Sequence, residues 1–205
     1  MKGKFITVEG VEGAGKTTQL SFIRDFLETA GRRVVLTREP GGSPLSEELR
    51  ALLLGHRHDM ATDTELLLLF AARAEHIHKV ILPALQAGNW VLCDRFTDAT
   101  YAYQGGGRGV PWRRIASLEE WVQGELRPDL TLLLDVSVEQ GLARVWQRGQ
   151  KDRFECEGVA FFQRVRSAYL DLAERYPERY RVINASYPVA VVSAKVAQVL
   201  TEWLD

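Results

Sequence analysis

One short segment near the start of the chain constrains the fold more than any other. Residues 10–17 read GVEGAGKT and fit the pattern G-x-x-x-x-G-K-[ST]. The apolar run 5–8 comes before this segment, as in a buried strand, and residues 17–27 after it carry apolar side chains at helical spacing. A strand, a glycine-rich turn and a helix in this order predict a phosphate-binding loop at the carboxyl end of a first strand.

The residue types of this loop suit a polyphosphate ligand. Glycines allow successive backbone N–H groups to turn toward one anion, and the following helix adds the positive end of its dipole at the same point. We expect Lys16 to reach the β- and γ-phosphates of a nucleotide and Thr17 to offer its hydroxyl to Mg²⁺. The other residues expected to bind the nucleotide are Gly10, Val11, Glu12, Gly13, Ala14, Gly15 and Thr18.

The bulk composition restricts the partners of the chain. Its 205 residues are 46% hydrophobic and 26% charged, which suits one α/β domain with a substantial core. A formal net charge of −1 predicts no general attraction to nucleic acid or to an anionic membrane. The longest apolar run, 66–72, is too short for a membrane span, and the early first strand leaves no room for a signal peptide. Because Cys93 and Cys156 lie far apart, we expect a cytoplasmic protein without a disulfide framework.

Strands and helices alternate along the rest of the chain. The sequence predicts further strands at 33–37, 90–95, 130–135 and 180–184, and helices at 43–54, 63–87, 111–126, 137–148, 159–176 and 188–204. This alternation predicts a single three-layer domain, in which a five-stranded parallel sheet has helices on both faces. We expect an interruption of the 63–87 helix at Pro83 and a mobile loop at the glycine-rich segment 105–109.

Charged residues follow two of these strands. Arg38 and Glu39 follow the second strand, and Asp94 and Arg95 end the third. Ligands of open α/β sheets bind at the carboxyl ends of the strands, so these residues are candidates for a binding site, although a surface salt bridge also explains Arg38 and Glu39. Asp94 and Asp135 both end strands and compete for the role of directing Mg²⁺. Asp94 is favoured because Arg95 follows it and can hold a second phosphate.

Two more segments are candidates for substrate contacts. Phe70 and Arg73 share a helix face, so the ring can stack on a nucleobase while the guanidinium bonds to its edge; a core position is the alternative for Phe70. The polar segment 148–155 contains Arg148 and Arg153. It reads either as a solvated loop or as a lid whose arginines close over the transferred phosphoryl group.

The phosphate loop alone does not distinguish a GTPase, a motor and a small-molecule kinase. The N-K-x-D and D-x-x-G strings typical of GTPases are absent from the sequence. A compact domain with an arginine-rich second site favours a nucleoside monophosphate kinase. The alternatives are a kinase for another small phosphate acceptor and a catalytically silent nucleotide-binding regulator.

Several motifs together resemble those of thymidylate kinases of the bacterial type. They are E-G-x-E-G-A-G-K-T-T at 9–18, T-R-E-P-G-G at 37–42, the Asp94-Arg95 pair, Y-Q-G-G-G at 103–107, R-P-D-L-T at 127–131 and the arginine pattern of 144–153. The resemblance runs along the whole chain. It implies transfer of the γ-phosphate of MgATP to dTMP, giving dTDP and ADP for dTTP synthesis, by an enzyme that is commonly a homodimer.

The resemblance also implies roles for single residues. Glu12 is expected near the 3′-hydroxyl of dTMP, Arg95 on the acceptor phosphate with Arg38 or Glu39 close by, and Arg144 beside adenine. The expected thymine pocket consists of Phe70 stacked on the base, Arg73 at its carbonyl edge, and Thr100, Tyr103 and Gln104 in the walls. Lys16, Arg95, Arg148 and Arg153 are the expected catalytic residues.

This chain departs from the family pattern at three positions. Gly13 stands where some relatives have arginine, which favours the lid as the source of transition-state cations. Ala99 replaces a common serine. Phe70 precedes Arg73 by three residues where several relatives have a spacing of four.

Overall fold

The computed structural model describes residues 3–55, 60–146, 153–154 and 156–204. Its sheet has five parallel strands in the order β2-β3-β1-β4-β5, so the predicted five-stranded parallel sheet is confirmed. The strands are β1 (Phe5–Glu9), β2 (Val34–Arg38), β3 (Trp90–Asp94), β4 (Leu130–Asp135) and β5 (Tyr180–Asn184). Every residue of β1 is buried, as a central strand covered on both faces requires.

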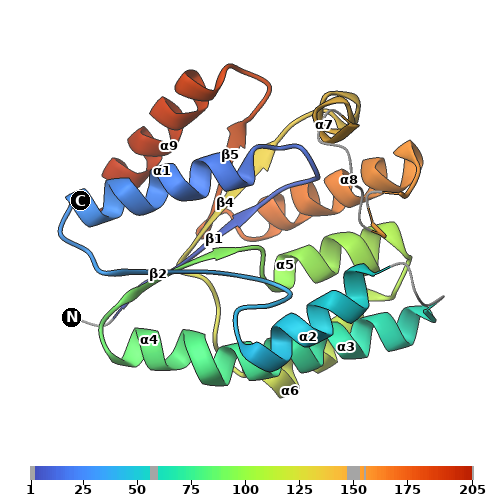
Figure 1. The fold of residues 1–205 in the computed structure, drawn as a ribbon. Coiled ribbons are helices and arrows are strands. Elements are labelled where there is room, and N and C mark those ends of the chain that lie inside the picture. The colour runs from blue at the N-terminus through green and yellow to red at the C-terminus, as the bar shows by residue number, and fades with distance from the viewer. Residues whose placement is uncertain (1–2, 56–59, 147–152, 155, 205) are drawn as a thin grey trace.

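Helices cover both faces of the sheet. Figure 1 shows α1 (Lys16–Thr29) and α9 (Val189–Leu204) together on one side, with α3 (Thr62–His76), α4 (Leu82–Gln86) and α8 (Val159–Arg175) on the other. The remaining helical elements are α2 (Pro44–Leu54), α5 (Thr97–Thr100), α6 (Trp112–Gln123), α7 (Val138–Trp146) and the π-helices η1 (Ile77–Ile81) and η2 (Tyr101–Gly107). Within the described residues, no helix is long and apolar enough to cross a membrane.

The helix expected to break at Pro83 instead continues through it. The π-helix η1 joins α3 to α4, and the N–H of Leu82 donates to the carbonyl of Ile77, five residues earlier. Pro83 lies in the first turn of α4, where the missing N–H of a proline is tolerated. The wider π-turn ahead of the proline therefore replaces the predicted interruption.

The segment 105–109, predicted to be a mobile loop, is mostly helical and packed. Gly105, Gly106 and Gly107 form the end of η2, between α6 and α8. A Cβ at Gly105 would lie 2.7 Å from Nε1 of Trp112, one at Gly106 would lie 2.8 Å from the carbonyl oxygen of Arg164, and one at Gly107 would overlap a ring. The prediction was wrong because these glycines permit close packing of helices rather than a loose backbone.

Candidate active site

The loop between β1 and α1 borders a cavity of about 750 Å³. Gly13 and Gly15 have φ angles of 72° and 89°, which favour glycine, and α1 begins at Lys16. The Lys16 ammonium donates to the carbonyl oxygens of Gly10 and Val11, each at 3.2 Å. Burial and the nearby positive charge of Arg95 lower the pKa of Lys16. The loop therefore gathers a lysine and the positive end of a helix at one point, as a phosphate site requires.

The loop packs directly against α7. A Cβ at Gly13 would overlap the backbone of Gly141, and one at Gly141 would lie 2.5 Å from the carbonyl oxygen of Glu12. Nη1 of Arg144, also on α7, donates to the carbonyl oxygens of Gly13 at 3.1 Å and Ala185 at 3.2 Å. Arg144 lines the cavity. Position 13 thus has no room for the arginine that some relatives carry, and the guanidinium beside this loop comes from α7.

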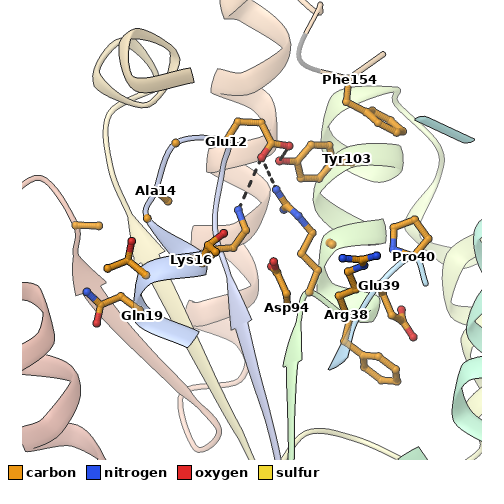
Figure 2. Close-up of a pocket in the computed structure, with 18 of the residues that line it drawn as sticks. Glu12, Ala14, Lys16, Gln19, Arg38, Glu39, Pro40, Asp94, Tyr103 and Phe154 are labelled. Carbon is orange, nitrogen blue, oxygen red and sulfur yellow. Dashed lines mark hydrogen bonds and ion pairs between the residues drawn. The ribbon is translucent and has the colours of Figure 1, made fainter. Parts of the chain in front are cut away.

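Glu12 joins the loop to the opposite wall of the cavity. Its carboxylate accepts from Nη2 of Arg95 at 2.6 Å and from the hydroxyl of Tyr103 at 2.9 Å, and it lies 3.8 Å from the Lys16 ammonium. Figure 2 shows Glu12 between Lys16 and Tyr103. Burial opposes ionisation of Glu12, but Arg95 and Lys16 outweigh it and lower its pKa.

Arg95 has an unusual backbone conformation that Glu9 stabilises. Its φ is 66°, a left-handed value that is uncommon for a residue with a side chain. The next N–H, of Phe96, donates to Oε1 of Glu9 at 2.7 Å, and the Tyr169 hydroxyl donates to Oε2 of Glu9 at 2.8 Å. Arg95 Nη1 in turn donates to Tyr169 at 3.1 Å and to the Gly10 carbonyl at 2.9 Å. Hydrogen bonds therefore fix both the backbone beside Arg95 and its side chain.

The structure separates the two carboxylates that compete for Mg²⁺. Asp94 ends β3 beside β1 and lines the cavity, and its Oδ1 is buried without a hydrogen-bond partner among the described residues. The oxygens of Asp135 accept from Nε and Nη2 of Arg166 at 2.6 and 2.8 Å. Asp135 is absent from the described residues that line the cavity. Of these two residues, Asp94 is therefore the one that has a carboxylate oxygen available to a cation at the cavity, as far as the described residues show.

Glu39 and Arg73 form a buried pair in the cavity wall. Nε of Arg73 donates to Glu39 at 2.7 Å, and Nδ1 of His76 lies 3.0 Å from the other oxygen of Glu39. Glu39 therefore fixes the position of the Arg73 guanidinium. The sequence alone does not indicate this role. Arg38 also lines the cavity, where it pairs with Glu47 at 2.8 Å on the more exposed side.

The two remaining nitrogens of Arg73 differ in their hydrogen bonds. Nη2 donates to Oγ1 of Thr100 at 3.0 Å, whereas Nη1 is buried without a partner among the described residues. Thr100, Tyr103 and Gln104 line the same cavity, as the sequence predicts. The side-chain amide of Gln104 is held by Glu65 on α3 at 2.7 Å.

The expected stacking position of Phe70 is wrong. Phe70 is buried with Leu66, Val110 and Ile115 and is absent from the described residues that line the cavity. Leu69 lines it instead. Successive residues on a helix point about 100° apart, so a shift of one position moves the side chain from the cavity to the core. The core alternative was the correct one.

The lid residues are only partly described. Arg148 and most of 148–155 lie outside the described residues. Arg153 donates from Nη2 to Glu65 at 2.6 Å and from Nε to the carbonyl oxygen of Leu53 at 3.0 Å. In this structure its guanidinium lies against α2 and α3 and is not part of the cavity wall. Its predicted catalytic role stays a prediction.

Comparison with known proteins decides the family. A family model described as thymidylate kinase matches residues 8–196. The chain belongs to the thymidylate kinase family. A thymidylate kinase of Alkalilimnicola ehrlichii is 57% identical over 210 residues, covering 100% of this chain and 97% of the relative. A thymidylate kinase of Pseudomonas putida is 59% identical over 202 residues, covering 98% of each chain.

Solved structures agree with this assignment. The crystal structure of thymidylate kinase from Ehrlichia chaffeensis is 35% identical to the chain, with a TM-score of 0.81, and the match covers 98% of this chain and 100% of that one. Thymidylate kinases phosphorylate dTMP with ATP to give dTDP. The chain is therefore a phosphotransferase with this reaction, and the predicted family and activity are confirmed.

Proposed function

We propose that ATP and dTMP bind in the two halves of the one cavity, with their phosphates meeting between Lys16 and Arg95. The observation that carries this proposal is the shared carboxylate of Glu12, which lies 3.8 Å from Lys16 and 2.6 Å from Arg95. The cation of the phosphate loop and the cation that follows β3 thus lie on either side of one anion. Donor and acceptor phosphates bound to these cations would be neighbours.

The donor half of the cavity consists of the phosphate loop and the residues near α9. Lys16 would exchange its two carbonyl contacts for the β- and γ-phosphates, and Thr17 and Thr18 would contact the same phosphates. Arg144 lies beside Ala185 at the cavity wall, a position that suits the adenine end of ATP.

The acceptor half lies along α3, α5 and η2. Arg95, with Arg38 nearby, would hold the phosphate of dTMP, and Glu12 would contact its 3′-hydroxyl. Arg73, Thr100 and Gln104 would hold the base, with Leu69 on its face. Tyr103 would crowd the 2′ position and disfavour a ribose. The resemblance of the motifs and the side chains that line the cavity support this arrangement.

The reaction needs alignment and positive charge more than a strong base. The second phosphate pKa of a nucleoside monophosphate is about 6, so the attacking oxygen is already largely ionised near neutral pH. Lys16 and Arg95 would orient the two phosphates and stabilise the charge that develops between them. Arg148 and Arg153 are proposed to add positive charge from a lid at about 148–155. For Arg153 this role requires its guanidinium to leave Glu65.

Asp94 and Thr17 would hold Mg²⁺. Oδ1 of Asp94, which is buried and has no hydrogen-bond partner in the described part of the chain, and the hydroxyl of Thr17 are oxygen ligands of the kind that this cation prefers. Both residues line the cavity. When bound, Mg²⁺ neutralises charge on the β- and γ-phosphate oxygens.

The resemblance of the motifs also supports a cytoplasmic homodimer built from single-domain subunits. Light scattering on the purified protein would give the oligomeric state directly. A monomer at micromolar concentration would contradict this part of the proposal.

The function is tested by ADP release from MgATP with dTMP, dUMP, dCMP, dGMP or AMP as acceptor. We expect a strong preference for dTMP, with dUMP used about 10-fold to 200-fold less well because it lacks one methyl group. Lys16→Met is the control and should be inactive with every acceptor. A preference for another acceptor would place a different ligand in the acceptor half, and inactivity of the wild type would support a regulatory binder.

A further inference from the structure

We propose that Glu65 determines the base selectivity of the acceptor site, because it fixes which end of the Gln104 side-chain amide faces the cavity. This inference rests on the proposed location of dTMP in the acceptor half. It makes Glu65 a positioning residue that acts on the base through Gln104.

Glu65 is a buried carboxylate surrounded by hydrogen-bond donors. Its side chain is 1% exposed. Oε1 accepts from Nε2 of Gln104 at 2.7 Å and lies 3.4 Å from Nε of Arg108, while Oε2 accepts from Nη2 of Arg153 at 2.6 Å. Glu65 itself is absent from the described residues that line the cavity. It can therefore influence a ligand only through its neighbours.

The Gln104 amide has one orientation that satisfies this carboxylate. A carboxylate accepts hydrogen bonds, so the amide NH₂ must face Glu65. Gln104 lines the cavity and is nearly fully buried, and its Oε1 accepts no hydrogen bond among the described residues. The amide oxygen is thus the end left for a ligand. The cavity offers a hydrogen-bond acceptor at this point.

Arg73 supplies the complementary donor. Its Nε and Nη2 are used by Glu39 and Thr100, while Nη1 is buried and unpartnered among the described residues. Thr100 and Gln104 lie four residues apart on the continuous helix of α5 and η2, so they occupy neighbouring turns. Arg73 and Gln104 both line the cavity, so a donor and an acceptor are available to one ligand there.

This donor and acceptor pair matches only one kind of pyrimidine. Thymine and uracil present a carbonyl oxygen at C4 and an N–H at N3, which suit Arg73 and Gln104 respectively. Cytosine presents an amino group and an unprotonated nitrogen at these positions, so both contacts would be reversed. If the residue at position 65 could donate a hydrogen bond, the Gln104 amide could turn around and present its NH₂ to the cavity. The NH₂ could then donate to the unprotonated N3 of cytosine, so one of the two mismatched contacts would become favourable.

The test compares dTMP with 5-methyl-dCMP as acceptors, because these nucleotides differ only at the C4 and N3 edge. In the Glu65→Gln variant, we expect the ratio of kcat/KM for dTMP to that for 5-methyl-dCMP to fall about 10-fold or more. The change should appear in the KM of the acceptor, with the KM of ATP unchanged. Glu119→Gln is the matched control. Glu119, on α6, is also a buried acid; it accepts from the hydroxyl of Tyr101, and neither residue is among the described residues that line the cavity. This variant should keep the wild-type ratio.

A double-mutant cycle separates this role from a general structural one. Gln104→Met removes both amide ends at similar size and should itself reduce the preference for dTMP. In that background Glu65→Gln should have no further effect on the ratio, because Glu65 acts through Gln104. An additional loss of selectivity in the double variant would overturn the proposal, and so would a Glu65→Gln variant that loses activity equally with both acceptors.

Two further outcomes are distinguishable. If the wild type does not prefer dTMP to 5-methyl-dCMP, the proposed location of dTMP fails before Glu65 is tested. If Glu65→Gln does not fold, as judged by circular dichroism, Gln104→Met still decides the matter. Unchanged selectivity in that variant would overturn the proposal, and reduced selectivity would support it.

Discussion

Arg95 donates a hydrogen bond of 2.6 Å from Nη2 to Oε2 of Glu12, which links the residue after β3 to the phosphate loop after β1. The same guanidinium reaches the Gly10 carbonyl through Nη1 at 2.9 Å. A planar guanidinium makes these contacts from two nitrogens in a fixed geometry, which the single nitrogen of an ammonium does not reproduce. Arg95 is therefore positioned on the loop before any substrate binds.

Arg95→Lys should keep the charge but lose this geometry. We expect kcat/KM for dTMP to fall about 10-fold to 100-fold, since charge-assisted hydrogen bonds contribute roughly 1.5–3 kcal/mol each. The KM of ATP should change little. Steady-state kinetics with each substrate varied in turn would measure this. The matched control is Arg166→Lys, because Arg166 pairs with Asp135 away from the cavity; equal effects of the two variants would contradict the role of Arg95.

The buried Glu9 should make stability depend on pH. Burial and the nearby Asp98 raise the pKa of Glu9 to about 8 from 4.5. Since the folded protein holds this proton more tightly than the unfolded chain, the contribution to stability is complete below about pH 4.5 and is lost as the pH rises through about 8. Relative to Glu9→Gln, the wild type should lose at most about 1.4 kcal/mol of unfolding free energy per pH unit in this window.

Urea unfolding of the wild type and of Glu9→Gln at several pH values measures this difference. The unfolding free energy of the wild type should fall steadily relative to that of Glu9→Gln between about pH 5 and pH 8. A constant difference across that range would show that Glu9 does not titrate there.

Asp94 and Asp135 should differ in their effect on the Mg²⁺ requirement. Asp94→Asn removes the negative charge of the carboxylate that lines the cavity and should raise the Mg²⁺ concentration for half-maximal activity at least about 10-fold. Asp135→Asn breaks the pair with Arg166 and should cost about 1 kcal/mol of stability or less, because that pair is partly exposed. Magnesium titrations of the two variants test the assignment, which fails if Asp135→Asn changes the requirement more.

Because Gly13 packs closely against Gly141, a substitution at position 13 should strongly destabilise the protein. Gly13 and Gly31 have similar φ angles of 72° and 76°, but a Cβ at Gly31 meets no atom within 4 Å. Gly31→Ala therefore measures only the backbone strain, roughly 1–2 kcal/mol. Gly13→Ala should be more destabilising in thermal unfolding and should also raise the KM of ATP. Equal melting temperatures of the two variants would mean that α7 moves aside freely.

The strands and the phosphate loop could be predicted because their signals are local. The apolar segments 130–135 and 180–184 were predicted with the bounds that the structure shows. The loop is recognised from eight consecutive residues. In both cases neighbouring residues in the sequence carry the physical cause of the structure.

Other features depend on contacts between distant segments. Leu69 rather than Phe70 lines the cavity because of how α3 is rotated against its neighbours, and a helical pattern that includes both residues does not fix that rotation. The roles of Glu9, Glu65 and Tyr169 come from hydrogen bonds to residues 39 to 160 positions away. A single acidic residue in a strand or helix gives no sign of such partners.

The charges that line the cavity have a consequence for how substrates arrive. Three carboxylates line the cavity, but six cations accompany them: Lys16, Arg38, Arg50, Arg73, Arg95 and Arg144. The described lining therefore has a net positive formal charge, which attracts a distant anion through a field that salt screens. Association rates of the nucleotides should therefore fall as the ionic strength rises.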